Sequence, residues 1–484
     1  MGWRSPQGPM SRSSRIILFA LIGFVALLVV VATGLFLLVR ANVDKARLEA
    51  TASEALAMQV VIGGRVRLDL FPSLLVTLED VHVRNGAVEV ASAKAVELGI
   101  DPFSLLRSNV LIETFAVKGP WIAIERYLNG RYNFESPQAA EAPLPALYWP
   151  RVSFSDGTLL YADKQSGAGF EAEHCGVDVS GLRLGGGQRA NLLRHLSFTA
   201  GLACGQVRTE GLTAVDLKLS AEAKDGVFDL KPIAIRVFGS QGPGSIRADF
   251  SGSEPIYHLR WSLPQFPIEE FFKAVSPKTL ASGRMDFSVN LSMQGRTLKM
   301  MRQAAQGQIS LRGKDLTLAG TDLDAAFSRF ESSQNFNLVD VGAFFFAGPL
   351  ALVVTKGYNF ASNFQGTQGS SEIRTLVSDW TVERGVAQAQ DVAMATRENR
   401  IALHGGLDFV DDRFDDVTMA LIDANGCAKV RQKIRGSFQH PVVENPSVLT
   451  SAAGPALRLL KKGSDLLRGR KCPVFYAGSV PAPK

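Results

Sequence analysis

Histidines and clustered carboxylates are the side chains of this sequence that could perform catalysis or hold a metal ion. Only six of its 484 residues are histidines, and none has the spacing of a catalytic base or of a zinc site. His174 adjoins Cys175, but one such pair is more typical of structural positions than of ligands. Four aspartates between residues 411 and 416 could hold Ca²⁺ yet lack the EF-hand pattern, so we expect a solvated turn there.

Motifs that would indicate an enzyme are missing from the sequence. It contains no Gly-x-Ser-x-Gly elbow, His-Glu-x-x-His pair, P-loop or Gly-x-Gly-x-x-Gly fingerprint, the local patterns of hydrolases, metalloproteases and nucleotide-binding proteins. Carboxylate pairs that act as acid and base leave no such pattern. We expect a protein that is not an enzyme and that needs no cofactor and no metal ion.

The four cysteines are Cys175, Cys204, Cys427 and Cys472. None belongs to a Cys-x-x-Cys motif, and they fall into two pairs that are near in sequence. An even number in such pairs is typical of disulfides and hence of an oxidising compartment. Four free buried thiols are the alternative.

The N-terminal segment Ile16–Val39 contains no charged residue. A helix needs about 20 apolar residues to cross the hydrocarbon core of a bilayer, so these residues predict a transmembrane anchor. A cleaved signal peptide would have a shorter apolar region and would end in small residues. Three basic residues precede the segment and three follow it closely, so the positive-inside rule does not orient the protein.

After a helical stretch at Asn42–Gln59, polar and apolar residues alternate with a period of two. The alternation is clear at Val66–Leu70, Ile122–Ile124, Val215–Leu219 and Ile233–Val237. This pattern predicts strands with one apolar and one polar face, and turn residues between the strands predict a long antiparallel meander. A stretch rich in Pro and Ala, residues 136–150, is the best candidate for a linker before a repeating β body at 151–445.

Helices are expected at only three further places: Pro267–Val275, Thr297–Gln306 and Val448–Arg468, the last within a tail at residues 446–484. So few helices cannot cover the apolar face of the predicted sheet. A packed sandwich, a closed barrel and a curled sheet with an apolar groove remain open. Val341–Thr355 has no charge but is too short and too broken for a second span. We expect a buried hairpin or another piece of the core there, and the alternative is a segment that contacts lipid in a groove or at a membrane surface.

The net charge of +6 is spread along the chain. No basic block with interleaved aromatic residues is present, so we expect no nucleic acid partner. Mild basicity suits a surface near anionic lipids and suits an ordinary solvated surface equally well.

The chain resembles the AsmA family of Gram-negative envelope proteins. The resemblance rests on the order and number of strand and loop signatures rather than on a catalytic motif. The signatures are Gly64–Pro72, Leu78–Asn85, Asp101–Leu106, Val117–Arg126, Asn129–Phe134, Gly283–Ser288, Gln306–Asp315 and Ile434–Pro441.

Several expectations about location follow from this resemblance. Residues 1–15 would be cytoplasmic, residues 16–39 would span the inner membrane, and the rest would stand in the periplasm. Residues 42–135 would form an N-terminal family-like unit and residues 260–445 a C-terminal one. The resemblance also suggests two disulfides, Cys427 with Cys472 and Cys175 with Cys204.

The resemblance further implies an elongated, curled, mainly β sheet similar to that of bridge-like lipid transfer proteins. Phospholipid would be the ligand, and other envelope proteins would be further candidate partners. The nine predicted groove-lining residues are Val66, Leu68, Leu70, Ile122, Ile124, Leu217, Leu219, Ile233 and Ile235. The alternatives are an ordinary packed core at these positions and a structural role in outer-membrane protein assembly or envelope integrity.

Overall fold

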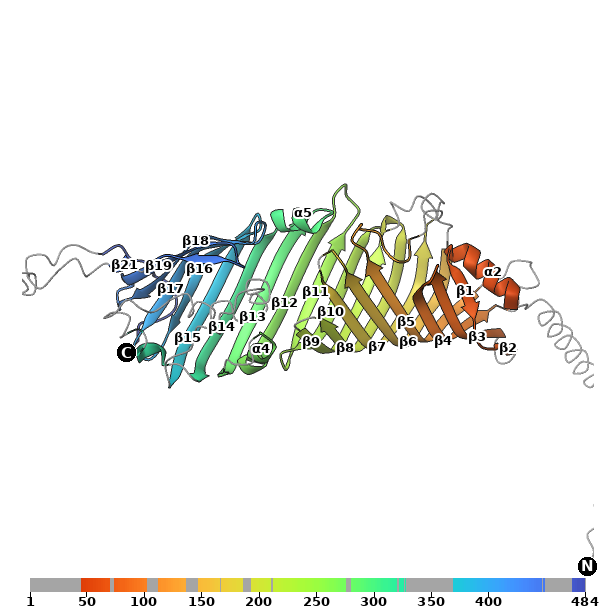
Figure 1. Ribbon diagram of the computed structural model, residues 1–484, viewed down its shortest axis with the longest axis horizontal. Helices are drawn as coiled ribbons and strands as arrows, with labels where there is room; N and C mark the ends of the chain where they lie inside the picture. The colour runs from red at the N-terminus through yellow and green to blue at the C-terminus, as the bar shows by residue number, and fades with distance from the viewer. Residues whose placement is uncertain are drawn as a thin grey trace, which may run out of the picture.

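The computed structural model of the protein is one long, curled β-sheet whose strands cross its long axis (Figure 1). The structure describes residues 45–69, 74–101, 112–135, 147–165, 167–185, 193–209, 212–275, 280–319, 322–325, 327, 369–445, 447–448 and 472–483. All 21 strands within these ranges belong to the same sheet. A packed pair of sheets and a closed barrel are therefore not the architecture of the described chain.

The strands follow one another in chain order from β3 to β19, and short helices interrupt them. The helices are α2 (Lys45–Leu56), α4 (Ile268–Val275) and α5 (Leu298–Gln303). The strands are β1 (Gln59–Ile62), β2 (Val66–Asp69), β3 (Leu74–Asn85), β4 (Val88–Ile100), β5 (Ile112–Arg126), β6 (Leu147–Asp163), β7 (Gly169–Leu184), β8 (Leu196–Thr209), β9 (Leu212–Lys224), β10 (Val227–Val237), β11 (Ser240–Asp249), β12 (Ile256–Pro267), β13 (Leu280–Gln294), β14 (Gln306–Ala319), β15 (Ser370–Glu383), β16 (Val386–Ala395), β17 (Arg400–Asp408), β18 (Arg413–Ile422), β19 (Ala428–Gly436), β20 (Pro441–Val443) and β21 (Ser447–Val448).

The prediction of a purely antiparallel sheet is wrong at one place, because β5 and β6 are parallel. Parallel neighbours require a crossover connection of a dozen or more residues, and residues 127–146 provide that length. The predicted linker at 136–150 is also too long, because Leu147–Pro150 already belong to β6. The sheet continues through this point, with Thr114 of β5 beside Arg151 of β6.

Both ends of the sheet are shielded by short elements. At the N-terminal end, β1 and β2 both pair with β3, and α2 lies beside β1 (Figure 1). Leu48 and Ala52 of α2 pack against a small cluster formed by Val60, Ile62 and Val81. At the C-terminal end, β19 pairs with the short strands β20 and β21. Short edge strands protect a sheet from pairing with other chains.

Residues at positive φ kink neighbouring strands and curl the sheet. Asp156 of β6, His174 of β7 and Asp216 of β9 all have φ between 53° and 54°. A residue of this kind within a strand is typical of a bulge, which bends the strand and increases its twist. Asp156 and His174 also contact each other, with 3.1 Å between Oδ1 and Nδ1, so the bulges of β6 and β7 lie side by side.

The predicted helices at 42–59, 267–275 and 297–306 are present, with ends that differ by a few residues. The predicted helix at 448–468 does not begin at Val448, which belongs to β21. Its remaining residues, the anchor at 16–39 and the apolar segment at 341–355 lie outside the described residues. Among the helices that the structure does describe, none has the length and apolarity to cross a membrane.

Candidate functional site

One face of the sheet carries continuous rows of apolar side chains. Residues that pair across neighbouring strands project to the same face, so the pairing register traces each row. The first row is Val66, Leu78, Val96, Val117, Phe154, Val177, Leu202, Leu219, Ile233, Gly244, Trp261, Val289, Ile309, Trp380 and Ala389. It crosses every strand from β2 to β16 without a charged residue, and a parallel row beside it begins with Leu68, Val76 and Leu98.

The apolar face is partly open to water at the N-terminal end of the sheet and dry at the C-terminal end. Leu202, Leu219 and Ile233 are only half-buried. By contrast, Leu311 of β14 is 0 % exposed and Trp380 of β15 is 2 % exposed. The same face is therefore a partly accessible apolar surface over β2–β12 and a packed core farther along. Single side chains within the accessible part are nevertheless buried, among them Val76, Val117 and Leu263.

Helix α4 helps to close the C-terminal part of this face. Its side chains Ile268, Phe271 and Phe272 are buried in the main core cluster. The ring of Phe271 meets that of Phe238 at 5.4 Å in a T-shaped contact. Figure 1 places α4 and α5 at opposite long edges of the sheet.

Eight of the nine predicted groove-lining residues lie within the described chain, and all eight are half-buried. Leu219 and Ile233 are direct neighbours in the register. Val66 lies in the same row at the far N-terminal end. The eight residues thus belong to one extended face rather than to one pocket, and Leu70 falls outside the described residues.

The remaining predicted positions occupy neighbouring parts of this surface. Ile122 pairs with Leu159, and Ile124 pairs with Tyr161. Ile235 packs against the main core cluster. Leu217 lies opposite Cys204.

Aromatic residues on the apolar face were not among the predicted positions. Phe198, Phe228, Phe250 and Tyr257 follow one another across β8–β12, and successive ring centroids are 6.2, 5.5 and 5.8 Å apart. Such ring pairs add about 0.5–1.5 kcal/mol beyond the area that they bury. The alternation Phe228-Asp229-Leu230 in the sequence was the signal that could have identified one member.

Both pairs of cysteines are joined by disulfides in the structure. Cys175 of β7 and Cys204 of β8 are register partners, and their side chains project to the apolar face. Cys427 is joined to Cys472 and holds the segment that follows residue 472 against the other face of the sheet.

The opposite face of the sheet is polar and carries cross-strand ion pairs. Examples are Lys118 with Glu97 at 2.6 Å, Arg247 with Asp229 at 2.7 Å, and Arg312 with Asp379 at 2.6 Å. Exposed pairs of this kind contribute little to stability, typically about 0–1 kcal/mol. They do keep this face hydrated, so the two faces of the sheet differ sharply in character.

The C-terminal segment covers the polar face over β15–β18. Phe475, Tyr476 and Val480 pack against small side chains of these strands, including Ala393 and Ala402. The Tyr476 hydroxyl donates to Asp391 Oδ1 at 2.5 Å. We call residues 472–483 the C-terminal strap.

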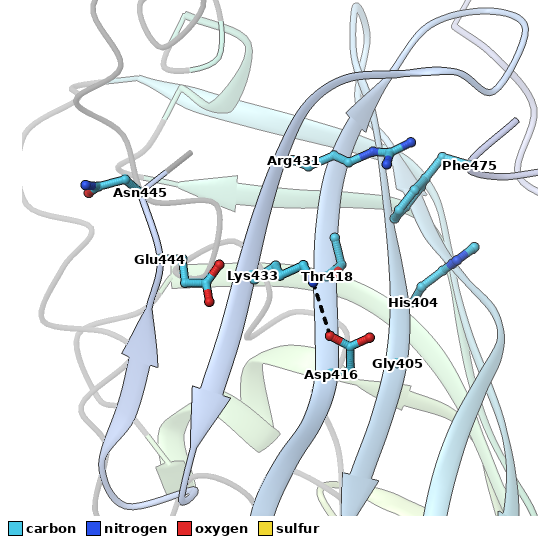
Figure 2. Close-up of a pocket in the computed structure, with 9 residues that line it drawn as sticks. All are labelled: His404, Gly405, Asp416, Thr418, Arg431, Lys433, Glu444, Asn445 and Phe475. Carbon is cyan, nitrogen blue, oxygen red and sulfur yellow. Dashed lines mark hydrogen bonds and ion pairs between the residues drawn. The ribbon is translucent and has the colours of Figure 1, made fainter. Parts of the chain in front are cut away.

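A polar pocket of about 550 Å³ lies beside this strap (Figure 2). His404 stacks on the ring of Phe475 with centroids 4.3 Å apart, and burial together with the nearby Arg431 charge lowers the pKa of His404. Lys433 pairs with Asp416 at 3.4 Å.

The charges of this pocket are largely compensated within the protein, since Glu444 also pairs with Arg435 at 2.9 Å. A neutral, stacked histidine beside compensated charges is not arranged as a nucleophile with its base. Across the described ranges, no group of three or more His, Cys, Asp or Glu side chains could hold a metal ion. The aspartates between residues 411 and 416 are among the described residues, and they do not form such a group.

The fold and its apolar face define an elongated, mainly β protein with a single open sheet, one side of which is an apolar surface that is partly accessible. The chain belongs to the AsmA family, which it matches over residues 10–186 and 187–351. The signature at Ile434–Pro441 lies beyond the matched residues. No curated protein and no solved structure matches the chain.

Proposed function

We propose that this protein assists phospholipid transport between the inner and outer membranes by holding acyl chains against the apolar face of its sheet. In this proposal, residues 16–39 anchor the chain in the bacterial inner membrane and the sheet stands in the periplasm. The protein acts by binding and guiding lipid, without a catalytic step.

The observation that carries the proposal is the half-buried apolar surface over β2–β12. Neighbouring strands are about 4.8 Å apart, so these eleven strands span roughly 50 Å. Exposing one CH₂ group to water costs about 0.8 kcal/mol, so a sixteen-carbon chain would cost on the order of 10 kcal/mol. A continuous apolar row removes much of that cost at every position along the sheet.

Membership of the AsmA family is compatible with this role. The two disulfides also support an extracytoplasmic location, because such bonds persist in oxidising compartments such as the periplasm. The polar face, with its cross-strand ion pairs, would remain in water while lipid occupies the other face.

The test is photo-crosslinking in bacterial cells that express the full chain and incorporate radiolabelled phosphate into lipid. A photoreactive residue replaces Leu219 on the apolar face or, as a matched control, its neighbour Lys218 on the polar face. We expect labelled lipid to be attached at position 219 and not at position 218. Equal labelling at both positions, or none at position 219 in correctly folded protein, would refute lipid binding on this face.

The second candidate function is a structural or interaction role in outer-membrane protein assembly or envelope integrity. The pocket beside the C-terminal strap favours it, because His404, Arg431 and Phe475 together form a shaped polar surface (Figure 2). In that case the working surface would be the polar face, and changes there would impair the envelope without altering lipid contact.

A further inference from the structure

Two arginines flank the turn between β11 and β12 at one long edge of the apolar face. Arg194 donates from Nε to the carbonyl of Phe250 at 2.9 Å and from Nη2 to the carbonyl of Gly252 at 2.5 Å. Arg296 donates from Nη2 to the carbonyl of Ser253 at 2.7 Å. Among the described residues, neither guanidinium has a carboxylate within 4.0 Å.

These carbonyl bonds fix the two side chains without neutralising them. A guanidinium has five N–H donors, and the bonds to the turn occupy two donors of Arg194 and one of Arg296. Both arginines are exposed, so their remaining donors are available to a ligand. A planar, pre-oriented fork of this kind suits the oxygens of a phosphate group.

The carboxylates nearest in sequence to this turn have other partners. Asp249 accepts from the backbone N–H of Ser251 at 2.9 Å and from its hydroxyl at 2.6 Å, and strand alternation directs its side chain away from the face that carries Phe250. Glu254 contacts Gln294 Nε2 at 3.4 Å.

Apolar rings lie immediately inside this edge. Phe250, at the start of the turn, contacts the rings of Phe228 and Tyr257, and Phe228 contacts Phe198. Positive charge at the edge is thus next to an aromatic, half-buried surface. This is the arrangement that an amphipathic molecule with an anionic head and apolar chains would match.

We propose that the arginine turn, defined as residues 250–253 with Arg194 and Arg296, binds the phosphate of a phospholipid whose acyl chains lie on the adjacent aromatic rings. The inference rests on the proposed function and adds to it a binding site for the lipid head group. Arg194 and Arg296 are the specificity-determining residues, because they distinguish a lipid with a phosphate from one without it.

The test measures lipid binding to the purified full chain in a mild detergent by native mass spectrometry. The ligands are phosphatidylglycerol, diacylglycerol with identical acyl chains, and inorganic phosphate. The variant is Arg194→Gln with Arg296→Gln. The matched control is Arg260→Gln on β12, which removes one positive charge from the opposite face.

We expect the double variant to bind phosphatidylglycerol about tenfold more weakly than the wild type, the size of a lost charge-assisted hydrogen bond, and to bind diacylglycerol equally well. The control binds both lipids like the wild type. Unchanged binding of phosphatidylglycerol by the double variant would overturn the proposal. Displacement of the lipid by an equal concentration of inorganic phosphate would identify the free anion as the ligand instead.

Two further outcomes separate this inference from the proposed function. If the wild type binds neither lipid, the proposed function itself fails and the inference fails with it. If the double variant loses binding of diacylglycerol as well, the two substitutions have disrupted the turn. The single variant Arg296→Gln then serves as the test of the phosphate site. This variant removes one bond to the turn, and an unchanged preference for phosphatidylglycerol over diacylglycerol would then refute the site.

Discussion

Cys175 of β7 lies directly opposite Cys204 of β8, with 4.0 Å between their Cα atoms, and the disulfide between them projects to the apolar face beside Leu217. A one-residue slip of a strand would turn all its side chains to the wrong face. A covalent bond between register partners prevents such a slip. The disulfide therefore protects the continuity of the apolar rows where β7, β8 and β9 meet.

Peptide mapping is expected to find all four cysteines bonded in protein isolated from its native compartment. Non-reducing digestion should yield linked peptides for Cys175 with Cys204 and for Cys427 with Cys472, because both pairs are joined in the structure. Alkylation before and after reduction provides the control. Thiols that are alkylated without reduction would contradict both the pairing and the oxidising location.

Truncation of a leucine is expected to cost much more in the dry part of the apolar face than in the open part. Leu311→Ala removes a side chain that is 0 % exposed, so we expect a loss of about 3 kcal/mol in the free energy of unfolding. Leu219→Ala at a half-buried position is expected to cost about 1 kcal/mol. Urea unfolding of the two variants makes the comparison, and equal losses would indicate a packed core at Leu219.

The C-terminal strap is expected to loosen when the hydroxyl of Tyr476 is removed. This hydroxyl donates to Asp391 and accepts from the backbone N–H of Val480 at 3.0 Å. Tyr476→Phe leaves Asp391 and the N–H of Val480 without this hydrogen-bond partner. We expect it to lower the free energy of unfolding by about 1–3 kcal/mol. Limited proteolysis of the strap measures the effect, with the exposed Tyr148→Phe as control. Equal protease resistance of both variants would contradict the role of this hydroxyl.

Acid is expected to weaken the attachment of the strap through Asp391. Burial opposes ionisation of this carboxyl, but hydrogen bonds from Ser479 and Tyr476 outweigh that effect and hold its pKa below the ordinary value. A folded-state pKa below the unfolded value of about 3.9 contributes stability above that pH and loses it as the pH falls through the folded pKa.

The stability of the wild type is therefore expected to decrease more steeply than that of Asp391→Asn as the pH falls from about 4 towards 2. Thermal unfolding across this pH range measures the difference. Parallel curves for the two proteins would show that Asp391 does not titrate in the way inferred.

Lys433→Ala separates the two candidate functions. Its ion pair with Asp416 is exposed, so the substitution should lower the free energy of unfolding by less than about 1 kcal/mol. If the apolar face performs the function, lipid crosslinking at position 219 and the resistance of cells to detergent both remain as in the wild type. Sensitised cells with unchanged crosslinking would favour the interaction role of the polar face.

Several local features follow directly from the sequence. The alternation at Val66–Leu68 and Val215–Leu219 predicts strands, because a period of two can satisfy one wet and one dry face only in a strand. The turn at Lys224–Gly226 and the short helix at 267–275 are likewise local signals that the structure bears out. The hairpin between β10 and β11 turns at Phe238 and Gly239, which have positive φ values, and Gly242 already belongs to β11.

Other features required the three-dimensional structure. The parallel pairing of β5 with β6 depends on where residues 127–146 return the chain, which no alternation pattern encodes. Whether Leu219 and Leu311 are equally buried also depends on what covers the face, and the core cluster that α4 joins contains Leu311 but not Leu219. The approach of Arg194 to Arg296 around one turn joins segments that are far apart in the chain.

The sequence by itself therefore determined that this chain forms two-faced strands with a candidate membrane anchor and cysteines suited to disulfides. These properties depend on residue type and on spacing over a few residues. Only the tertiary structure decided that the strands form one open sheet, that the apolar rows run unbroken across it, and that the N-terminal part of this surface remains partly accessible. Those properties arise from pairing and covering between distant segments, and the free energy of such contacts is not contained in any local pattern.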